Sequence, residues 1–231
     1  MCFVALQHGS VDAIREDELL EERPRGPSDL LHISGWRTVV SKSMTCTQTI
    51  ESTHPYAANM EMLQSVSFPG ASQIALFFDM KCSTERKYDV LTVYKDAFSK
   101  EIWGDMGGYS GSTGWPGTDG KRPILIPSDH CCLHFKSDGS RQDWGFKVVA
   151  IAPVCKESMM MLKDEFIGVS TFIVETALMR ANNHVVQARE FLVTDMSTLL
   201  AEEEAAIRLR DVNSNVSRGL FKDPSGSLQV K

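Results

Sequence analysis

The sequence lacks two features that would place it at a membrane or on a nucleic acid. No apolar stretch approaches the roughly 18 uninterrupted residues that a membrane-spanning helix requires. Basic residues are not in excess, because 24 lysines and arginines stand against 30 aspartates and glutamates, for a net charge of −6. A nucleic-acid-binding surface needs a basic field. The composition therefore predicts neither a membrane span nor a nucleic-acid partner.

Cysteine pairs with metal-binding spacing are also missing. No two of the six cysteines form the Cys-x-x-Cys pair of a structural zinc site. They are Cys2, Cys46, Cys82, Cys131, Cys132 and Cys155. The first nine residues lack the basic start and the long apolar run of a secretion signal. We therefore expect reduced thiols and a cytoplasmic location, although the even count leaves open three disulfides in a secreted fragment.

Hydrophobic residues make up 42% of the 231 residues, which is enough for one large domain or two small ones. The pattern changes along the chain and predicts four segments. Residues 1–46 are expected to be helical or irregular, 47–153 to form β-strands, and 155–195 to form three short helices. Residues 196–231 are expected to continue as a helix and then, from Val212, as a disordered tail rich in serine, asparagine and glycine.

The β segment consists of short apolar runs separated by turn residues. Strands are expected near residues 64–68, 74–78, 88–94, 124–126, 130–135 and 146–151. In residues 88–94, Val90, Thr92 and Tyr94 alternate with Leu91 and Val93, as in a strand with two different faces. Many short strands of this kind predict an antiparallel sandwich, so the expected fold class is α+β in two modules.

Two motifs in the β segment resemble those of the CUB domain, a jelly-roll sandwich. They are Tyr88-Asp89, at the start of a strand, and Ser137-Asp138-Gly139-Ser140, followed by Gly145-Phe146. The segment looks closest to cysteine-poor CUB-like modules inside large intracellular proteins with ZZ-type zinc fingers or ubiquitin-ligase domains.

The CUB resemblance implies a calcium site at one end of the sandwich. Asp89 and Asp138 match two of the family's three acidic ligands, and the third is Asp79 or Glu85, between which the sequence does not choose. Calcium takes six to eight oxygen ligands, so three carboxylates with loop carbonyls and water would suffice. The alternative is that these carboxylates only accept backbone hydrogen bonds in turns.

Catalysis and zinc binding have little support. His130, Cys131, Cys132 and His134 are close in sequence, but neighbours on a strand point to opposite faces. Cys131 and Cys132 therefore cannot easily share one ion, and the same geometry opposes a Cys/His nucleophile. Paired carboxylates would also suit a glycosidase, but nothing places an acid and a nucleophile around a cleft. We expect no enzyme activity.

The helical segment resembles the ubiquitin-associated domain. The matching features are the loop Ile167-Gly168-Val169, an Asn182-Asn183 turn and an amphipathic third helix that ends near Leu192 and Val193. Ser170 and Asn182 or Asn183 are plausible N-caps of the second and third helices. The resemblance implies an exposed patch, formed by this loop and the end of the third helix, that meets ubiquitin.

The expected ubiquitin-binding residues are therefore Ile167, Gly168, Val169, Leu192 and Val193. Val169 stands where the family more often has an aromatic residue, so a smaller contact area and weak binding are expected. The alternative is a structural adaptor whose patch packs on another part of the protein.

Together these features predict a non-catalytic binding or scaffold chain, a piece of a larger ubiquitin-system protein. Its bundle is expected to bind ubiquitin or a ubiquitinated protein, and its sandwich another protein. If the whole protein is a ligase, its catalytic domain lies outside these residues. The runner-up is a calcium-dependent, extracellular-type CUB adhesion module with a structural helical appendage.

Overall fold

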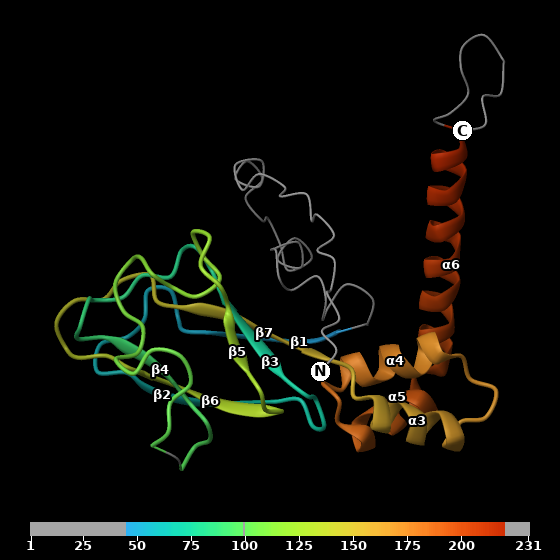
Figure 1. Ribbon diagram of the computed structural model, residues 1–231, viewed down its shortest axis with the longest axis horizontal. Coiled ribbons are helices and arrows are strands. Elements are labelled where there is room, and N and C mark those ends of the chain that lie inside the picture. The colour runs from blue at the N-terminus through green and yellow to red at the C-terminus, as the bar shows by residue number, and fades with distance from the viewer. Residues whose placement is uncertain (1–44, 99, 220–231) are drawn as a thin grey trace, which may run out of the picture.

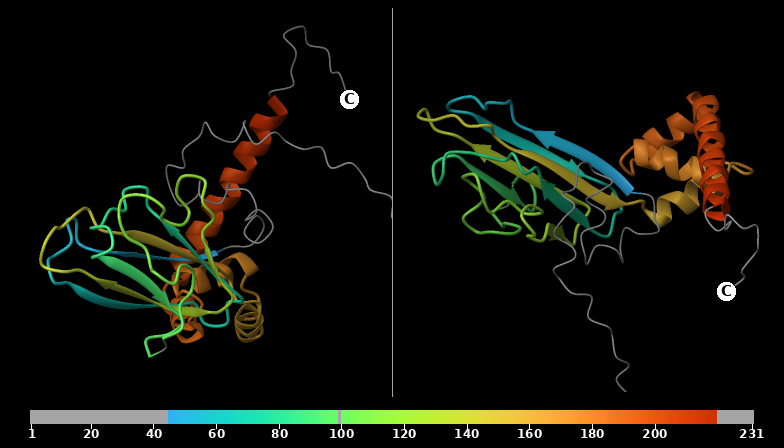
Figure 2. Two further views of the ribbon diagram at one scale, coloured as in Figure 1. Left: turned by 60° about the vertical axis from the view of Figure 1, so that its left-hand side comes forward. Right: turned by 90° about the horizontal axis from the view of Figure 1, so that it is seen from above.

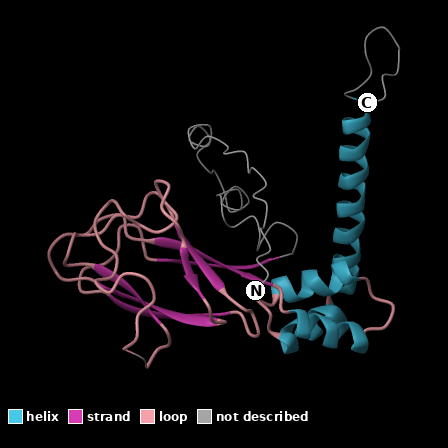
Figure 3. Ribbon diagram, in the orientation of Figure 1, coloured by secondary structure: helices cyan, strands magenta, loops and turns pink. Residues whose placement is uncertain are grey.

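The computed structural model describes residues 45–98 and 100–219, with side chains as far as residue 212. Strands and helices occupy separate parts of the molecule, with the strands preceding the helices in sequence (Figures 1 and 3). The helix pattern expected within residues 1–46 lies outside the described residues. The described chain is therefore a β module followed by a helical module.

The β module consists of two antiparallel sheets that lie face to face (Figure 2, right). The first sheet has the strand order β1-β7-β3-β5 and the second has the order β2-β6-β4. The strands are β1 (Thr45–Glu51), β2 (Glu61–Ser67), β3 (Ile74–Phe78), β4 (Val90–Tyr94), β5 (Ile124–Ile126), β6 (His130–Lys136) and β7 (Lys147–Pro153). An antiparallel sandwich within an α+β fold is thereby confirmed.

The alternation of side chains along the strands explains the core between the sheets. In β4, Leu91 and Val93 are buried while the residues between them are half-buried, as the sequence pattern predicted. Strand β1 was not among the predicted strands, because only Cys46 and Ile50 interrupt its polar run with buried side chains. This strand pairs with β7 along its whole length, so the sandwich includes residues 45 and 46.

The helical module contains the three expected helices and a longer fourth one. Their bounds are α3 (Lys156–Glu165), α4 (Thr171–Arg180), α5 (Val185–Thr194) and α6 (Met196–Gly219). The core of the bundle includes Leu162, Val174, Leu178 and Leu192. Helix α6 packs on α4 and α5 near its start and then projects from the bundle (Figure 1). The tail expected from Val212 is helical as far as Gly219.

The two modules meet through a direct contact between α4 and β1. Asn183 is fully buried at this joint, where its side chain accepts a hydrogen bond from the Cys155 N–H and donates one to the Pro153 carbonyl, both at 3.0 Å. The Cys46 thiol also donates to the Leu178 carbonyl across the joint at 3.7 Å. Asn182 and Asn183 adopt positive φ values of 48° and 67° before α5, and the N-cap is His184. The expectation that an asparagine caps α5 is therefore wrong.

The five cysteines in the described residues are all free and buried. Cys131 belongs to the core between the sheets, and Cys132 points from the opposite face of β6. No helix in the described part of the chain combines the length and the apolar character needed to cross a membrane.

Candidate functional site

Three carboxylates come together at the end of the sandwich that lies away from the helices. Glu85 and Asp89 belong to the segment between β3 and β4, and Asp138 belongs to the segment between β6 and β7. Oxygens of these three side chains lie within 4.8 Å of one another. The Asp89 N–H donates to the Glu85 carbonyl at 3.0 Å, so a tight turn brings the first two acids together. The structure thus assembles a cluster from residues far apart in sequence.

Asp89 is the buried centre of this cluster, with no exposed surface. One of its oxygens accepts the hydroxyl of Tyr56, and the other accepts the Asp138 N–H at 2.8 Å. The Tyr56 oxygen in turn accepts the Glu85 N–H at 3.1 Å. Burial, followed by the neighbouring Asp89 carboxylate, raises the pKa of Tyr56 to about 12. The phenol therefore stays protonated at neutral pH and holds Asp89 in place as a hydrogen-bond donor.

Asp138 and Glu85 form the partly exposed rim of the cluster. The Ser140 hydroxyl lies 2.6 Å from an Asp138 oxygen and 2.7 Å from a Glu85 oxygen. The Arg141 N–H donates to Glu85 at 3.1 Å. The hydrogen bond from the Ser140 side chain, with its backbone N–H second, holds the pKa of Asp138 below its usual range. The Asp138 carboxylate therefore stays ionised at neutral pH.

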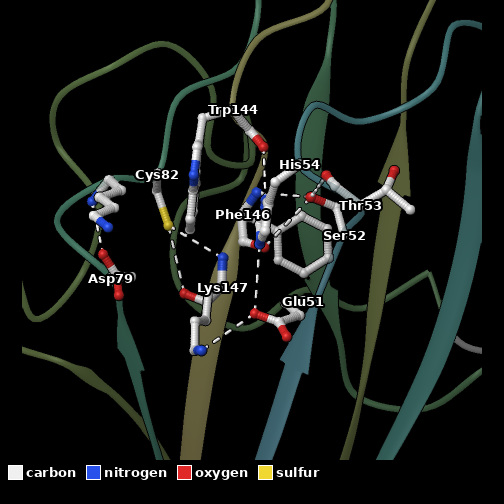
Figure 4. A network of polar contacts seen from close by, with 10 residues as sticks. Glu51, Ser52, Thr53, His54, Asp79, Cys82, Trp144, Phe146 and Lys147 are labelled. Carbon is white, nitrogen blue, oxygen red and sulfur yellow. Dashed lines mark hydrogen bonds and ion pairs between the residues drawn. The ribbon is translucent and has the colours of Figure 1, made fainter. Parts of the chain in front are cut away.

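A neighbouring network holds the loop between β6 and β7 against the end of β1 (Figure 4). The rings of His54 and Trp144 stack with centroids 3.8 Å apart, and a nitrogen of His54 lies 2.7 Å from the Trp144 carbonyl. The Phe146 N–H donates to the Ser52 hydroxyl at 3.1 Å. At Gly145, whose φ is +103°, an added Cβ would lie 2.0 Å from the Ser52 oxygen. This packing fixes the path of the segment that carries Asp138.

The sequence left the third acid open between Asp79 and Glu85, and the structure brings Glu85, not Asp79, to the other two acids. Glu85 lies in the cluster, whereas Asp79 caps its own turn by accepting the Lys81 N–H at 2.8 Å. Hard carboxylate oxygens converging at this spacing fit calcium, with water completing its coordination. The sequence reasoning did not assign site roles to Tyr56 and Ser140. Ser140 belongs to the motif of residues 137–140 that the sequence analysis used to identify the sandwich.

The apolar loop of the helical module lies between α3 and α4. The side chain of Ile167 is 91% exposed, and Gly168 has a φ of +87° with nothing within 4 Å of the place where a Cβ would be. Val169 is half-buried against the bundle core, and its carbonyl accepts a hydrogen bond from Lys163. Ser170 accepts the Ile173 N–H at 3.2 Å and caps α4, as predicted. The loop is thus held where it enters α4, with one large apolar side chain in solvent.

The end of α5 contributes one further exposed apolar residue. Val193 is 68% exposed, but Leu192 is only 1% exposed and belongs to the bundle core. Adjacent residues on a helix point in directions about 100° apart, so the two cannot both face the same surface. Leu192 is therefore removed from the expected contact residues, and Ile167, Gly168, Val169 and Val193 remain.

Sequence comparison finds similarity to short parts of very large proteins. The human E3 ubiquitin-protein ligase HERC2 is 36% identical over 106 residues, which cover 45% of this chain and 2% of HERC2. The human zinc finger ZZ-type and EF-hand domain-containing protein 1 is 31% identical over 106 residues, with coverage of 46% and 3%. The human probable E3 ubiquitin-protein ligase HECTD4 is 32% identical over 110 residues, with coverage of 44% and 3%. The chain thus spans about 2–3% of the length of these curated relatives.

Comparison with solved structures finds CUB domains. The crystal structure of the MASP-1 CUB2 domain bound to Ca2+ has 20% identity and a TM-score of 0.37, covering 45% of this chain and 90% of that chain. The CUB1-EGF-CUB2 domain of human MASP-1/3 has 23% identity and a TM-score of 0.39, covering 48% and 44%. No protein-family model matches the chain.

Proposed function

We propose that this chain is a non-catalytic protein-binding unit of a larger ubiquitin-system protein, and that its helices form a ubiquitin-associated domain that binds ubiquitin. The observation that carries the proposal is the exposure of Ile167, at 91%, in the loop between α3 and α4. Val193 adds a second exposed apolar side chain. In the proposed contact surface these two side chains act together, since contiguous apolar patches mark interaction sites. Two of the sequence relatives are named ubiquitin ligases, which supports this choice of partner.

The way the bundle docks on the sandwich favours ubiquitin binding over an adaptor role for the loop. The bundle contacts the sandwich through α4, and partly buried Met179 on α4 packs against the sandwich core. Ile167 and Val193 lie on other elements and stay exposed. The loop is therefore free for a partner while another face of the bundle makes the structural contact.

Weak affinity is expected from the size of this surface. Val169 is half-buried and Leu192 is buried, so few apolar side chains can reach a partner. Burial of apolar surface contributes about 25 cal/mol per Å², so the loss of some tens of Å² of contact weakens binding by roughly 1 kcal/mol. Dissociation constants in the upper micromolar range, about −5 to −6 kcal/mol, are expected.

The proposal is tested by titrating the full chain over immobilised ubiquitin. Ile167→Asp places a charge at the centre of the proposed contact and is expected to weaken binding by about tenfold or more, since 1.4 kcal/mol corresponds to tenfold. Leu209→Asp is the matched control, because Leu209 is 65% exposed on α6, away from the loop. Equal binding by the two variants would contradict the proposal.

Calcium binding by a CUB-like sandwich is a second candidate function. The observation that favours it is the convergence of Glu85, Asp89 and Asp138 within 4.8 Å. A bound cation would relieve the repulsion among these acids and order the segments that carry them. A calcium-stabilised sandwich end would be suited to binding another protein.

A further inference from the structure

A groove of about 510 Å³ separates the β2–β3 turn of the sandwich from the start of α5. Pro69 and Gly70 line it from the turn, and Val186 and Gln187 line it from α5. The groove lies at the opposite end of α5 from Val193, about 10 Å along the helix axis at 1.5 Å per residue. It is therefore separate from both the apolar loop and the acidic cluster.

The first turn of α5 is uncapped where it faces this groove. The N-cap residue His184 makes no side-chain capping hydrogen bond, and the first turn contains no acidic residue. Asn183 could supply a capping oxygen, but that oxygen already accepts the Cys155 N–H. The free N–H groups and the helix dipole together give this end of α5 a partial positive charge.

Ser158 on α3 provides an independent indication of a ligand. It lines the same groove and is only 8% exposed. Nevertheless, no residue in the described part of the chain forms a hydrogen bond with its hydroxyl. This oxygen is not among the fully enclosed polar atoms that lack a partner, so the hydroxyl is open to the groove and can donate to an external acceptor. The free hydroxyl and the uncapped α5 N–H groups can therefore serve the same anionic group.

We propose that this groove binds an acidic residue of a partner peptide, whose carboxylate caps α5 from outside. The oxygens of the carboxylate accept hydrogen bonds from the first-turn N–H groups and from Ser158. The apolar neighbours of the acidic residue pack on Pro69 and on Val186, which is 74% exposed. An anion at a helix N-terminus is stabilised by both the N–H groups and the dipole.

The two nearby acids of the chain do not fill this role. Asp129 accepts the Gly70 N–H at 3.1 Å and pairs with His130. Glu157 lies next to Ser158 and accepts the Cys155 thiol at 3.4 Å. Both carboxylates are thus held by other partners, and neither lines the groove.

The test is an amide NMR titration of the full chain with the peptide acetyl-Leu-Asp-Leu-amide. The control peptide is acetyl-Leu-Asn-Leu-amide, which has nearly the same shape but no charge. We expect saturable shifts of the Val186 and Gln187 amides with the Asp peptide, and binding about tenfold weaker with the Asn peptide. No saturable shift at these amides, or equal affinity for both peptides, would overturn the inference.

Two substitutions to aspartate at opposite ends of α5 separate this site from the ubiquitin surface. His184→Asp supplies an internal cap for α5, so it should raise the melting temperature of the chain. It should also weaken binding of the Asp peptide by about tenfold, and ubiquitin binding should stay unchanged. Val193→Asp should weaken ubiquitin binding and leave the peptide unaffected. Ser158→Ala should weaken binding of the Asp peptide several-fold. Unchanged peptide binding in both His184→Asp and Ser158→Ala would show that the groove does not bind the carboxylate.

Discussion

Asp89 illustrates how much a single buried carboxylate determines at the end of the sandwich. Its two oxygens accept hydrogen bonds from Tyr56 and from the Asp138 N–H, so it links three segments of the chain. Replacing it would disrupt the fold as well as a cation site. Residues at the rim of the cluster are therefore better probes of cation binding.

Calcium is expected to raise the stability of the chain through this cluster. At a concentration one hundred times the dissociation constant, a ligand adds about 2.7 kcal/mol to the free energy of unfolding. Glu85→Gln and Asp138→Asn should each abolish most of this gain, because they remove ligand charge. The measurement is urea unfolding with and without calcium chloride.

Asp79→Asn is the matched control for the calcium experiment. Asp79 lies on the same segment as Glu85 but accepts the Lys81 N–H in its own turn. This variant should keep the full response to calcium. If calcium does not change the free energy of unfolding of the wild-type chain, calcium binding is ruled out as the second candidate function.

At the level of single residues, the sequence predicted that Asp89 and Asp138 lie together, but it could not choose between Glu85 and Asp79 as the third acid. The choice depends on the turn that joins the Asp89 N–H to the Glu85 carbonyl, which periodicity does not reveal. Leu192 was misplaced for a related reason. Its apolar character suited both a core and a surface patch, and only the packing of α5 on its neighbours decides between them.

Among the elements, the turn between α4 and α5 helps to hold the two modules together. Asn183 has a positive φ and uses both ends of its side-chain amide on the segment that joins the modules. A sequence pattern of two asparagines predicts a turn, but it does not show which side chain points into a joint. This explains why capping was assigned to the wrong residue.

Asn183→Ala is expected to lower the free energy of unfolding by about 2–4 kcal/mol, because it leaves the buried Cys155 N–H and Pro153 carbonyl without partners. Asn182→Ala is the control. Asn182 also has a positive φ, but none of the described residues forms a hydrogen bond with its side chain. Urea unfolding should therefore show a clearly smaller loss for Asn182→Ala. Equal losses would mean that backbone strain, rather than the joint, explains the effect.

Most strands and helices followed from alternation and helical periodicity, and the exceptions have physical causes. Strand β1 was not predicted because its threonine and glutamine side chains face outward at a sheet edge. The length of α6 was underestimated because its residues beyond Val212 are poor helix formers.

Across the whole molecule, buried thiols give the fold a dependence on alkaline pH. Burial raises the pKa of Cys46, Cys82 and Cys131 to about 12, compared with 9.0 for an unperturbed thiol. The folded state therefore retains protons that the unfolded state loses. The stabilisation is complete below about pH 9 and is lost as the pH rises toward about 12.

The free energy of unfolding should fall by up to about 1.4 kcal/mol per pH unit for each of these thiols between about pH 9 and 12. Urea unfolding in a reducing buffer at about pH 8, 9.5 and 10.5 measures this slope. Cys82→Ala should make the fall in the free energy of unfolding with pH less steep, by the contribution of one thiol. Constant stability across this range would show that these thiols are not buried as described.

The most direct test of the account is an amide NMR titration of the full chain with unlabelled ubiquitin. The account predicts shifts centred on Ile167, Gly168, Val169 and Val193, with little change at the sandwich end or at Val186. Shifts confined to the sandwich, or no shifts at millimolar ubiquitin, would contradict ubiquitin binding by the bundle. The bundle would then be a structural adaptor.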